Sequence, residues 1–161
     1  FDQVLADPPE AVVLAAVAQA REQQAELVIG FGGGSSMDVA KLVALLAHPN
    51  CTQTLQDIYG VGNARGQRLP LIQVPTTAGT GSEVTQIAII TTGATTKMGV
   101  VSPILLPDLA LLDAGEPLRE APRRLSEAFR DSEDLEAIGR VLQFAVQLAG
   151  GVQGLQFLLS F

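Results

Sequence analysis

Two segments of this 161-residue chain combine small residues, hydroxyl groups and unhindered backbone amides, as phosphate-binding loops do. In the first, the apolar strand predicted at residues 26–30 leads into the three glycines 32–34. These glycines allow a sharp turn and leave no β-carbon in the way of a ligand. Ser35 and Ser36 then begin a predicted helix, whose first amides have no partner within the helix and attract an anion such as a diphosphate.

The second segment repeats this arrangement further along the chain. A buried strand is predicted at residues 70–75, and the loop 76–83 that follows it reads TTAGTGSE. Two strands separated by a helix, here predicted at residues 37–47, form a βαβ unit whose carboxyl-end loops lie side by side over one crevice. We therefore expect a ligand that carries several phosphates or ribose hydroxyls.

The remaining elements complete an α/β fold around this unit. The helix at 37–47 is expected to pack through one face, made of Val39, Ala40, Val43, Ala44 and Leu46. The other predicted elements are a helix after Pro9, one helical turn near residues 55–59, a β-hairpin of strands 87–92 and 97–102, and a short buried strand at 109–113 that ends in Asp113.

Composition narrows the class of protein. Hydrophobic residues make up 47% of the chain and charged residues 17%, which is enough for one core. The net charge of −7 and the scattered basic residues argue against a nucleic-acid partner, because phosphate neutralisation supplies most of that affinity. With Cys51 and His48 as the single cysteine and histidine, we expect no disulfide framework and no His/Cys metal site, and a cytoplasmic location fits best.

The last part of the chain differs in character from the rest. Residues 114–140 are rich in charge and helix-forming residues, whereas residues 141–161 carry no charge at all. Four glutamines and three glycines within 141–161 make membrane insertion costly, so we expect a core or partner surface there, through which the chain could form a homo-oligomer. The sequence thus predicts a boundary between an α/β domain at 1–113 and a helical tail at 114–161.

The motifs, taken together, resemble those of the iron-dependent (group III) alcohol dehydrogenases. Residues 32–41 read GGGSSMDVAK, residues 75–85 read PTTAGTGSEVT, Lys97 precedes the run GVVSP, and residues 111–113 read LLD, with one methionine between Lys97 and its run. Three ordered motifs at the family's spacing make the resemblance specific, and it extends from Phe1 to about Asp113. It implies a Rossmann-like domain with a parallel sheet, of which the family's first strands precede this chain, so that the sheet is incomplete at its N-terminus.

The resemblance also implies a cofactor, NAD or NADP, and a role for individual residues. Gly33, Gly34 and Ser35, with Asp38 beside them, would hold the pyrophosphate; Thr76, Thr77 and Thr80 would line the adenine and ribose pocket; and Thr85, Ile87 and Lys97 would approach the nicotinamide half. The implied reaction is hydride transfer between a small alcohol or aldehyde and the nicotinamide, with a divalent metal (iron or zinc) polarising the oxygen.

The family's metal ligands are an aspartate and three histidines, and none of these histidines has a counterpart in this chain. Asp131 and Asp134 could stand at the aspartate position, but Leu135 and Ile138 occupy the positions four residues further on. We therefore assign no catalytic and no metal-binding residues. The chain is interpreted as the truncated cofactor-binding part of a dehydrogenase, inactive alone. The alternative is a non-catalytic nucleotide-binding or interaction module that has lost the metal site.

Several of these residues also have a purely structural interpretation. Asp38, three residues after Ser35, is placed as a capping-box partner at the start of the helix. Lys97 could be a solvated hairpin lysine, and the hydroxyls of Thr76 and Thr77 could bind their own backbone at the end of a strand.

Overall fold

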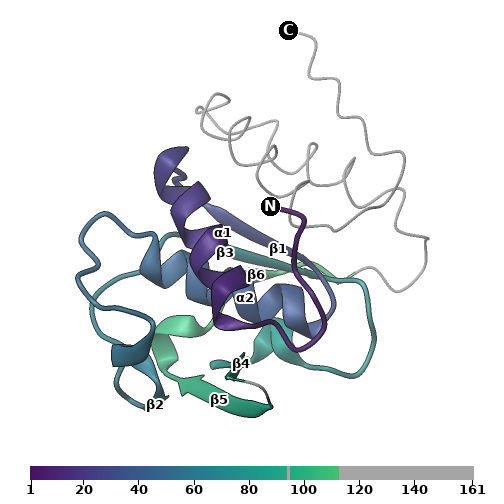
Figure 1. Cartoon of the computed structure of the whole chain (residues 1–161). Coiled ribbons are helices and arrows are strands. Elements are labelled where there is room, and N and C mark those ends of the chain that lie inside the picture. The colour runs from purple at the N-terminus through teal and green to yellow at the C-terminus, as the bar shows by residue number, and fades with distance from the viewer. Residues whose placement is uncertain (94, 113–161) are drawn as a thin grey trace, which may run out of the picture.

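The computed structural model describes residues 1–93 and 95–112, and its centre is a parallel β-sheet. Strands β1 (Val28–Gly32), β3 (Leu71–Pro75) and β6 (Leu109–Ala110) lie in the order β1-β3-β6, all parallel. Gly32 is opposite Pro75 in the ladder, so β1 and β3 end at the same edge of the sheet. The predicted βαβ unit is therefore confirmed, and Figure 1 shows the helix α2 beside these strands.

The described part of the chain has two α-helices, α1 (Glu10–Glu22) and α2 (Gly34–Leu46); α2 packs on β1 and β3, and α1 packs on α2. Helix α2 begins three residues before the predicted start at 37, and β1 ends two residues after the predicted end at 30. Pairing with β3 extends β1 as far as Gly32, and the helix needs only Gly33 as its N-cap. The glycines thus form a turn of one residue between strand and helix, tighter than the apolar pattern alone predicts.

A second three-stranded sheet lies on the other side of α2. The hairpin of β4 (Ile87–Thr92) and β5 (Thr96–Val101) is antiparallel as predicted, and β2 (Gly60–Val61) pairs with β5 in parallel. The predicted helical turn near 55–59 is confirmed as a 3-10 turn at Gln56–Ile58. Two further 3-10 turns, Ser82–Val84 and Pro103–Leu105, precede β4 and follow β5. Strand β2 went unpredicted because two residues give no periodicity to detect.

Helix α2 is buried on every side between these layers. It packs against β1 and β3 on one side, against β4 on another and against α1. Every residue from Val39 to Leu46 is buried, so the prediction of a single packing face is wrong. The reason is tertiary: the β4–β5 hairpin covers the face of α2 that the sheet leaves open. One consequence is that the only charged residue of this stretch, Lys41, lies inside the protein.

The C-terminal end of the described part is less buried than predicted. Strand β6 spans two residues rather than five, and Leu109 keeps 44% of its surface exposed, because β6 is an edge strand with one ladder partner among the described residues. Asp113, the predicted domain boundary and the tail 114–161 lie outside the described residues. Within residues 1–93 and 95–112, no helix has the length and apolar character needed to cross a bilayer.

Arg68 and Asp108 join the start of β3 to the segment before β6. The Arg68 guanidinium donates to both carboxylate oxygens of Asp108, at 2.6 and 2.9 Å, and the Leu71 amide donates to Asp108 at 2.8 Å. These bonds, the Arg68 bond first, lower the pKa of Asp108 below its usual value, against a smaller opposing effect of burial. A carboxylate with a depressed pKa stabilises the fold above its unfolded-state pKa and loses that contribution as the pH falls through its folded-state pKa.

We expect the substitution Asp108→Asn to lower the free energy of unfolding at pH 7 by about 1 kcal/mol, because the pair is partly exposed. In urea denaturation the difference from the wild type should shrink as the pH falls below about 4, where the wild-type carboxyl also becomes protonated. Glu22→Gln is the control, since it removes one charge from an exposed position at the end of α1. A difference for Asp108→Asn that stays constant down to pH 2 would contradict the assignment.

Candidate cofactor-binding site

The N-terminus of α2 presents three backbone amides at the edge where β1 and β3 end. Gly33 is the N-cap and no side chain caps the helix; the first helical bond runs from the Met37 amide to the Gly33 carbonyl at 3.1 Å. The amides of Gly34, Ser35 and Ser36 donate to no protein acceptor among the described residues. Because they also carry the positive end of the helix dipole, they suit an anion.

The two small-residue loops lie against each other, as the sequence predicts. The Thr76 amide donates to the Gly32 carbonyl at 2.8 Å, which joins the loops where they leave the sheet. A β-carbon built on Gly33 would stand 3.4 Å from the Thr77 Oγ1, and one built on Gly34 would stand 3.4 Å from the Thr80 Cγ2. The two loops therefore approach each other so closely at Gly33 and Gly34 that any larger side chain there would press against the threonines.

The threonines of the second loop carry hydroxyls that the protein leaves available. Thr77 and Thr80 are exposed and Thr76 is half-buried. Within the described part of the chain, the hydroxyls of Thr76 and Thr77 have no hydrogen-bond partner, so the interpretation that they bind their own backbone is wrong. The Thr80 hydroxyl accepts only a long bond, 3.4 Å, from the Ser82 amide. The Thr77 hydroxyl lies beside Gly33 and the Thr80 side chain lies beside Gly34, at the start of α2.

The residues predicted for the nicotinamide half are only partly available. The Thr85 hydroxyl lies 3.2 Å from the Lys41 Nζ, and the Ile87 side chain at the start of β4 is 39% exposed. Lys97 is bound to the Asp7 carboxylate at 2.5 Å, and both side chains are more than half exposed. Lys97 therefore agrees with its structural interpretation as a solvated lysine of the β-hairpin. A cofactor contact would require Lys97 to leave an ion pair that is worth at most about 1 kcal/mol.

Asp38 does not form the predicted capping box and instead accepts hydrogen bonds from residues outside α2. Its Oδ1 accepts from the Ser82 hydroxyl at 2.6 Å, and its Oδ2 accepts from the Ile89 amide at 3.0 Å. The capping box is therefore wrong. Gly33, not Ser35, is the N-cap, so Asp38 lies beyond the first turn and faces the second sheet.

Lys41 is the residue of this region whose role the sequence analysis missed. Its side chain is fully buried, and Nζ lies within hydrogen-bonding distance of the Ile87 carbonyl (2.6 Å), the Ser82 hydroxyl (3.0 Å) and Asp38 (3.5 Å), besides Thr85. Burial lowers the pKa of Lys41, and the nearby carboxylates of Asp38 and Glu83 oppose that shift. The sequence offered one sign of this role: Lys41 is the single polar residue in the segment 39–47, and a helix that is apolar on all sides is buried on all sides.

Comparison with known proteins agrees with this geometry. Residues 1–114 match the family model described as iron-containing alcohol dehydrogenase. The chain belongs to the iron-containing alcohol dehydrogenase family. The long-chain-alcohol dehydrogenase 1 of Geobacillus thermodenitrificans is 40% identical over 124 residues, which cover 76% of this chain and 31% of that enzyme. The NAD-dependent methanol dehydrogenase of Bacillus methanolicus is 33% identical over 114 residues, which cover 70% of this chain and 29% of that enzyme.

Solved structures show the same fold. A crystal structure of 1,3-propanediol oxidoreductase superposes with a TM-score of 0.66 at 25% identity and covers 93% of this chain and 49% of that chain. The chain thus spans about a third of the length of the curated family members it matches. Members of this family use NAD(P) and a divalent metal. The free amides at the start of α2, next to Gly33 and Gly34, fit NAD(P).

The described residues do not fit the metal of the iron-containing alcohol dehydrogenases. Residues 1–93 and 95–112 contain no group of three or more His, Cys, Asp or Glu side chains that could hold an ion. The histidine of the chain, His48, follows the C-terminal end of α2, and its Nδ1 accepts from the Asn50 amide at 3.2 Å. No catalytic step can therefore be derived through a metal from these residues.

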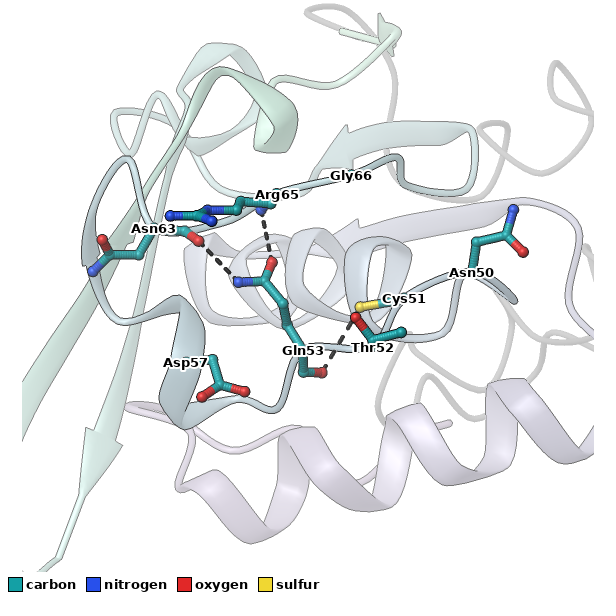
Figure 2. A pocket seen from close by; sticks show the side chains of 8 residues that line it. All are labelled: Asn50, Cys51, Thr52, Gln53, Asp57, Asn63, Arg65 and Gly66. Atoms are coloured by element: carbon teal, nitrogen blue, oxygen red, sulfur yellow. Dashed lines mark hydrogen bonds between the residues drawn. The ribbon is translucent and has the colours of Figure 1, made fainter.

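A polar hollow of about 490 Å³ lies elsewhere on this family domain. Figure 2 shows its lining residues, which follow the end of α2 or belong to the loop before β3: Asn50, Cys51, Thr52, Gln53, Asp57, Asn63, Arg65 and Gly66. The Gln53 amide crosses the hollow, donating to the Asn63 carbonyl and accepting from the Arg65 amide. The 13 residues of α2, at 1.5 Å each, separate it from the glycine loop by about 20 Å, so it is not the cofactor crevice.

Proposed function

We propose that residues 1–112 form the cofactor-binding part of an NAD(P)-dependent alcohol dehydrogenase. The observation that carries this proposal is the pair of adjoining loops: α2 begins with three free amides, and Gly33 and Gly34 lie close to the side chains of Thr77 and Thr80. In this assignment Gly33, Gly34 and Ser35 hold the diphosphate, Thr76, Thr77 and Thr80 contact the adenosine half, and Thr85, Ile87 and Lys97 lie towards the nicotinamide. The binding energy comes from main-chain donors rather than from basic side chains.

The proposed reaction is hydride transfer between an alcohol or aldehyde and the nicotinamide. The names of the two relatives, a long-chain-alcohol dehydrogenase and an NAD-dependent methanol dehydrogenase, support an alcohol as substrate and NAD as cofactor. In this assignment the described residues orient the cofactor but contain no group of side chains that could hold a metal. We therefore propose that catalysis needs a further part of the enzyme and that the boundary of the cofactor-binding part lies near residue 113.

The 161-residue chain should bind NADH or NADPH yet show no alcohol-dependent reduction of NAD(P) at any concentration of Fe²⁺ or Zn²⁺. Binding is measured by fluorescence titration with each reduced cofactor, and turnover by absorbance at the nicotinamide band. Absence of binding with both cofactors refutes the proposed site. Turnover by this chain refutes the statement that catalysis needs a further part.

A domain exchange distinguishes a dehydrogenase part from a module that only binds nucleotides. The matching segment of the Geobacillus enzyme is replaced by residues 1–113 of this chain. If the proposal is correct, the chimera oxidises alcohols, because the remaining domains of that enzyme complete the site. A chimera that is folded, binds NADH and has no activity supports the alternative, a nucleotide-binding module that no longer serves catalysis.

A further inference from the structure

Lys41 is a charged group in a position that is costly to maintain. It is 0% exposed, and it lies on a helix whose neighbouring positions are all buried and apolar apart from Asp38. Removing an ammonium from water is unfavourable unless hydrogen bonds and an opposite charge compensate it. Here the compensation comes from outside α2 as well as from within it, so the contacts of Lys41 connect separate parts of the fold.

The partners of Lys41 lie on two segments outside α2. The Ser82 hydroxyl belongs to the 3-10 turn that ends the second loop, and the Ile87 carbonyl opens β4. Asp38, one helical turn earlier, duplicates this connection, because it accepts from Ser82 and from the Ile89 amide of β4. Lys41 and Asp38 thus form one tether from α2 to the loop end and to the second sheet.

The tether joins the three segments to which cofactor contacts are assigned. Helix α2 carries the diphosphate amides at its N-terminus, Ser82 ends the loop that carries Thr76 to Thr80, and Thr85 with Ile87 begins the segment towards the nicotinamide. We propose that Lys41, held by Asp38, is a positioning residue that fixes the nicotinamide-side segment relative to the diphosphate loop. This inference rests on the proposed function and adds to it how the two halves of the site are held in register.

The proposal predicts an effect that depends on which part of the cofactor is present. The adenosine side is held independently, because the Thr76 amide is bonded to the Gly32 carbonyl and not to Lys41. Loss of the tether should therefore weaken NADH, which spans both halves, more than ADP, which reaches only the diphosphate loop and the threonines. We expect Lys41→Met to lower the affinity for NADH about tenfold, equivalent to about 1.4 kcal/mol, and the affinity for ADP by less than about threefold.

Two further variants separate positioning from stability. Gln73→Leu changes another fully buried polar residue, whose side-chain amide donates to the Met37 carbonyl of α2 at 3.1 Å and makes no hydrogen bond to the second loop or to β4 within the described residues. Lys41→Met/Asp38→Asn removes the uncompensated carboxylate that the single variant leaves, while asparagine keeps a carbonyl for the Ile89 amide. We expect the ratio of NADH to ADP affinity to fall in both Lys41 variants and to remain at the wild-type value in Gln73→Leu.

A measurement without any ligand tests the tether separately from the proposed function. In hydrogen exchange of the full chain, Lys41→Met should speed exchange of the amides from Ser82 to Ile89 relative to those of β1 and β3, whereas Gln73→Leu should not. If the wild type binds neither NADH nor ADP, the proposed function fails and the exchange result still decides whether the tether exists. An unchanged affinity ratio in a cofactor-binding Lys41→Met chain, or unchanged exchange in residues 82–89, overturns the positioning role.

Discussion

The variant Gly34→Val is expected to lose at least about 100-fold in affinity for the reduced cofactor, close to 2.7 kcal/mol, while remaining folded. A β-carbon at Gly34 already approaches the Thr80 Cγ2 to 3.4 Å, so the two methyl groups of valine must occupy the space between the loops. Gly34 is the first residue of α2 and is only partly buried, so the substitution costs the fold little beyond helix propensity. The measurement is fluorescence titration beside urea denaturation.

Ala11→Val is the matched control for this substitution. It also places valine in the first turn of a helix, α1, at an exposed position that is distant from the loops in sequence and carries no assigned cofactor contact. Similar stability of the two variants, with affinity lost only in Gly34→Val, identifies the space between the loops as the ligand site. Wild-type affinity in Gly34→Val would mean that the glycines serve close packing and that the diphosphate does not bind there.

The parts of this fold that could be predicted from the sequence are those that local patterns encode. The strand at β3, the hairpin and the two loops are each marked by apolar runs and small residues within about ten positions, and the structure confirms them. The adjacency of the loops also followed, because parallel strands of one βαβ unit end at the same edge. The local features therefore predict that the two loops lie side by side, and the structure confirms this with Gly33 and Gly34 next to Thr77 and Thr80.

The features that escaped prediction depend on contacts between distant segments. No local pattern shows that the hairpin would pack on α2, and without that contact Val39 to Leu46 reads as a helix with one apolar face. The same contact explains Asp38, which was assigned to a local capping box but accepts from Ser82 and Ile89, more than forty residues away. Lys41 was overlooked for the same reason, since its partners are brought to it only by the second sheet.

Gly30→Ala is expected to be the most destabilising small substitution in the described part of the chain, because β1 lies directly over a buried side chain there. A β-carbon on Gly30 would stand 2.1 Å from the Gln73 Oε1 and 2.8 Å from the Ala40 Cβ, both in the fully buried core. Gln73 cannot move away without giving up its bond to the Met37 carbonyl. Overpacking of this kind costs about 2 to 3 kcal/mol, a large part of the stability of a small domain.

Gly99→Ala is the control for Gly30→Ala, because a β-carbon on this other strand glycine meets only the Ala88 carbonyl at 4.0 Å. It should leave the free energy of unfolding unchanged or raise it slightly, since alanine restricts the unfolded chain more than glycine does. The clash itself is isolated by a double-mutant cycle with Gln73→Ala, in which the destabilisation by Gly30→Ala should fall by about 1 kcal/mol or more once the amide is gone.

The coupling would also explain why the Gln73 Oε1 accepts no hydrogen bond in the described structure. This oxygen fills the notch that Gly30 leaves in β1, and the lack of a side chain at Gly30 is what allows β1 and α2 to pack closely enough to place the Gly33 turn beside Thr77. A cycle with no coupling between the two sites would contradict this account, because the cost of Gly30→Ala would then have to arise from the Ala40 contact alone.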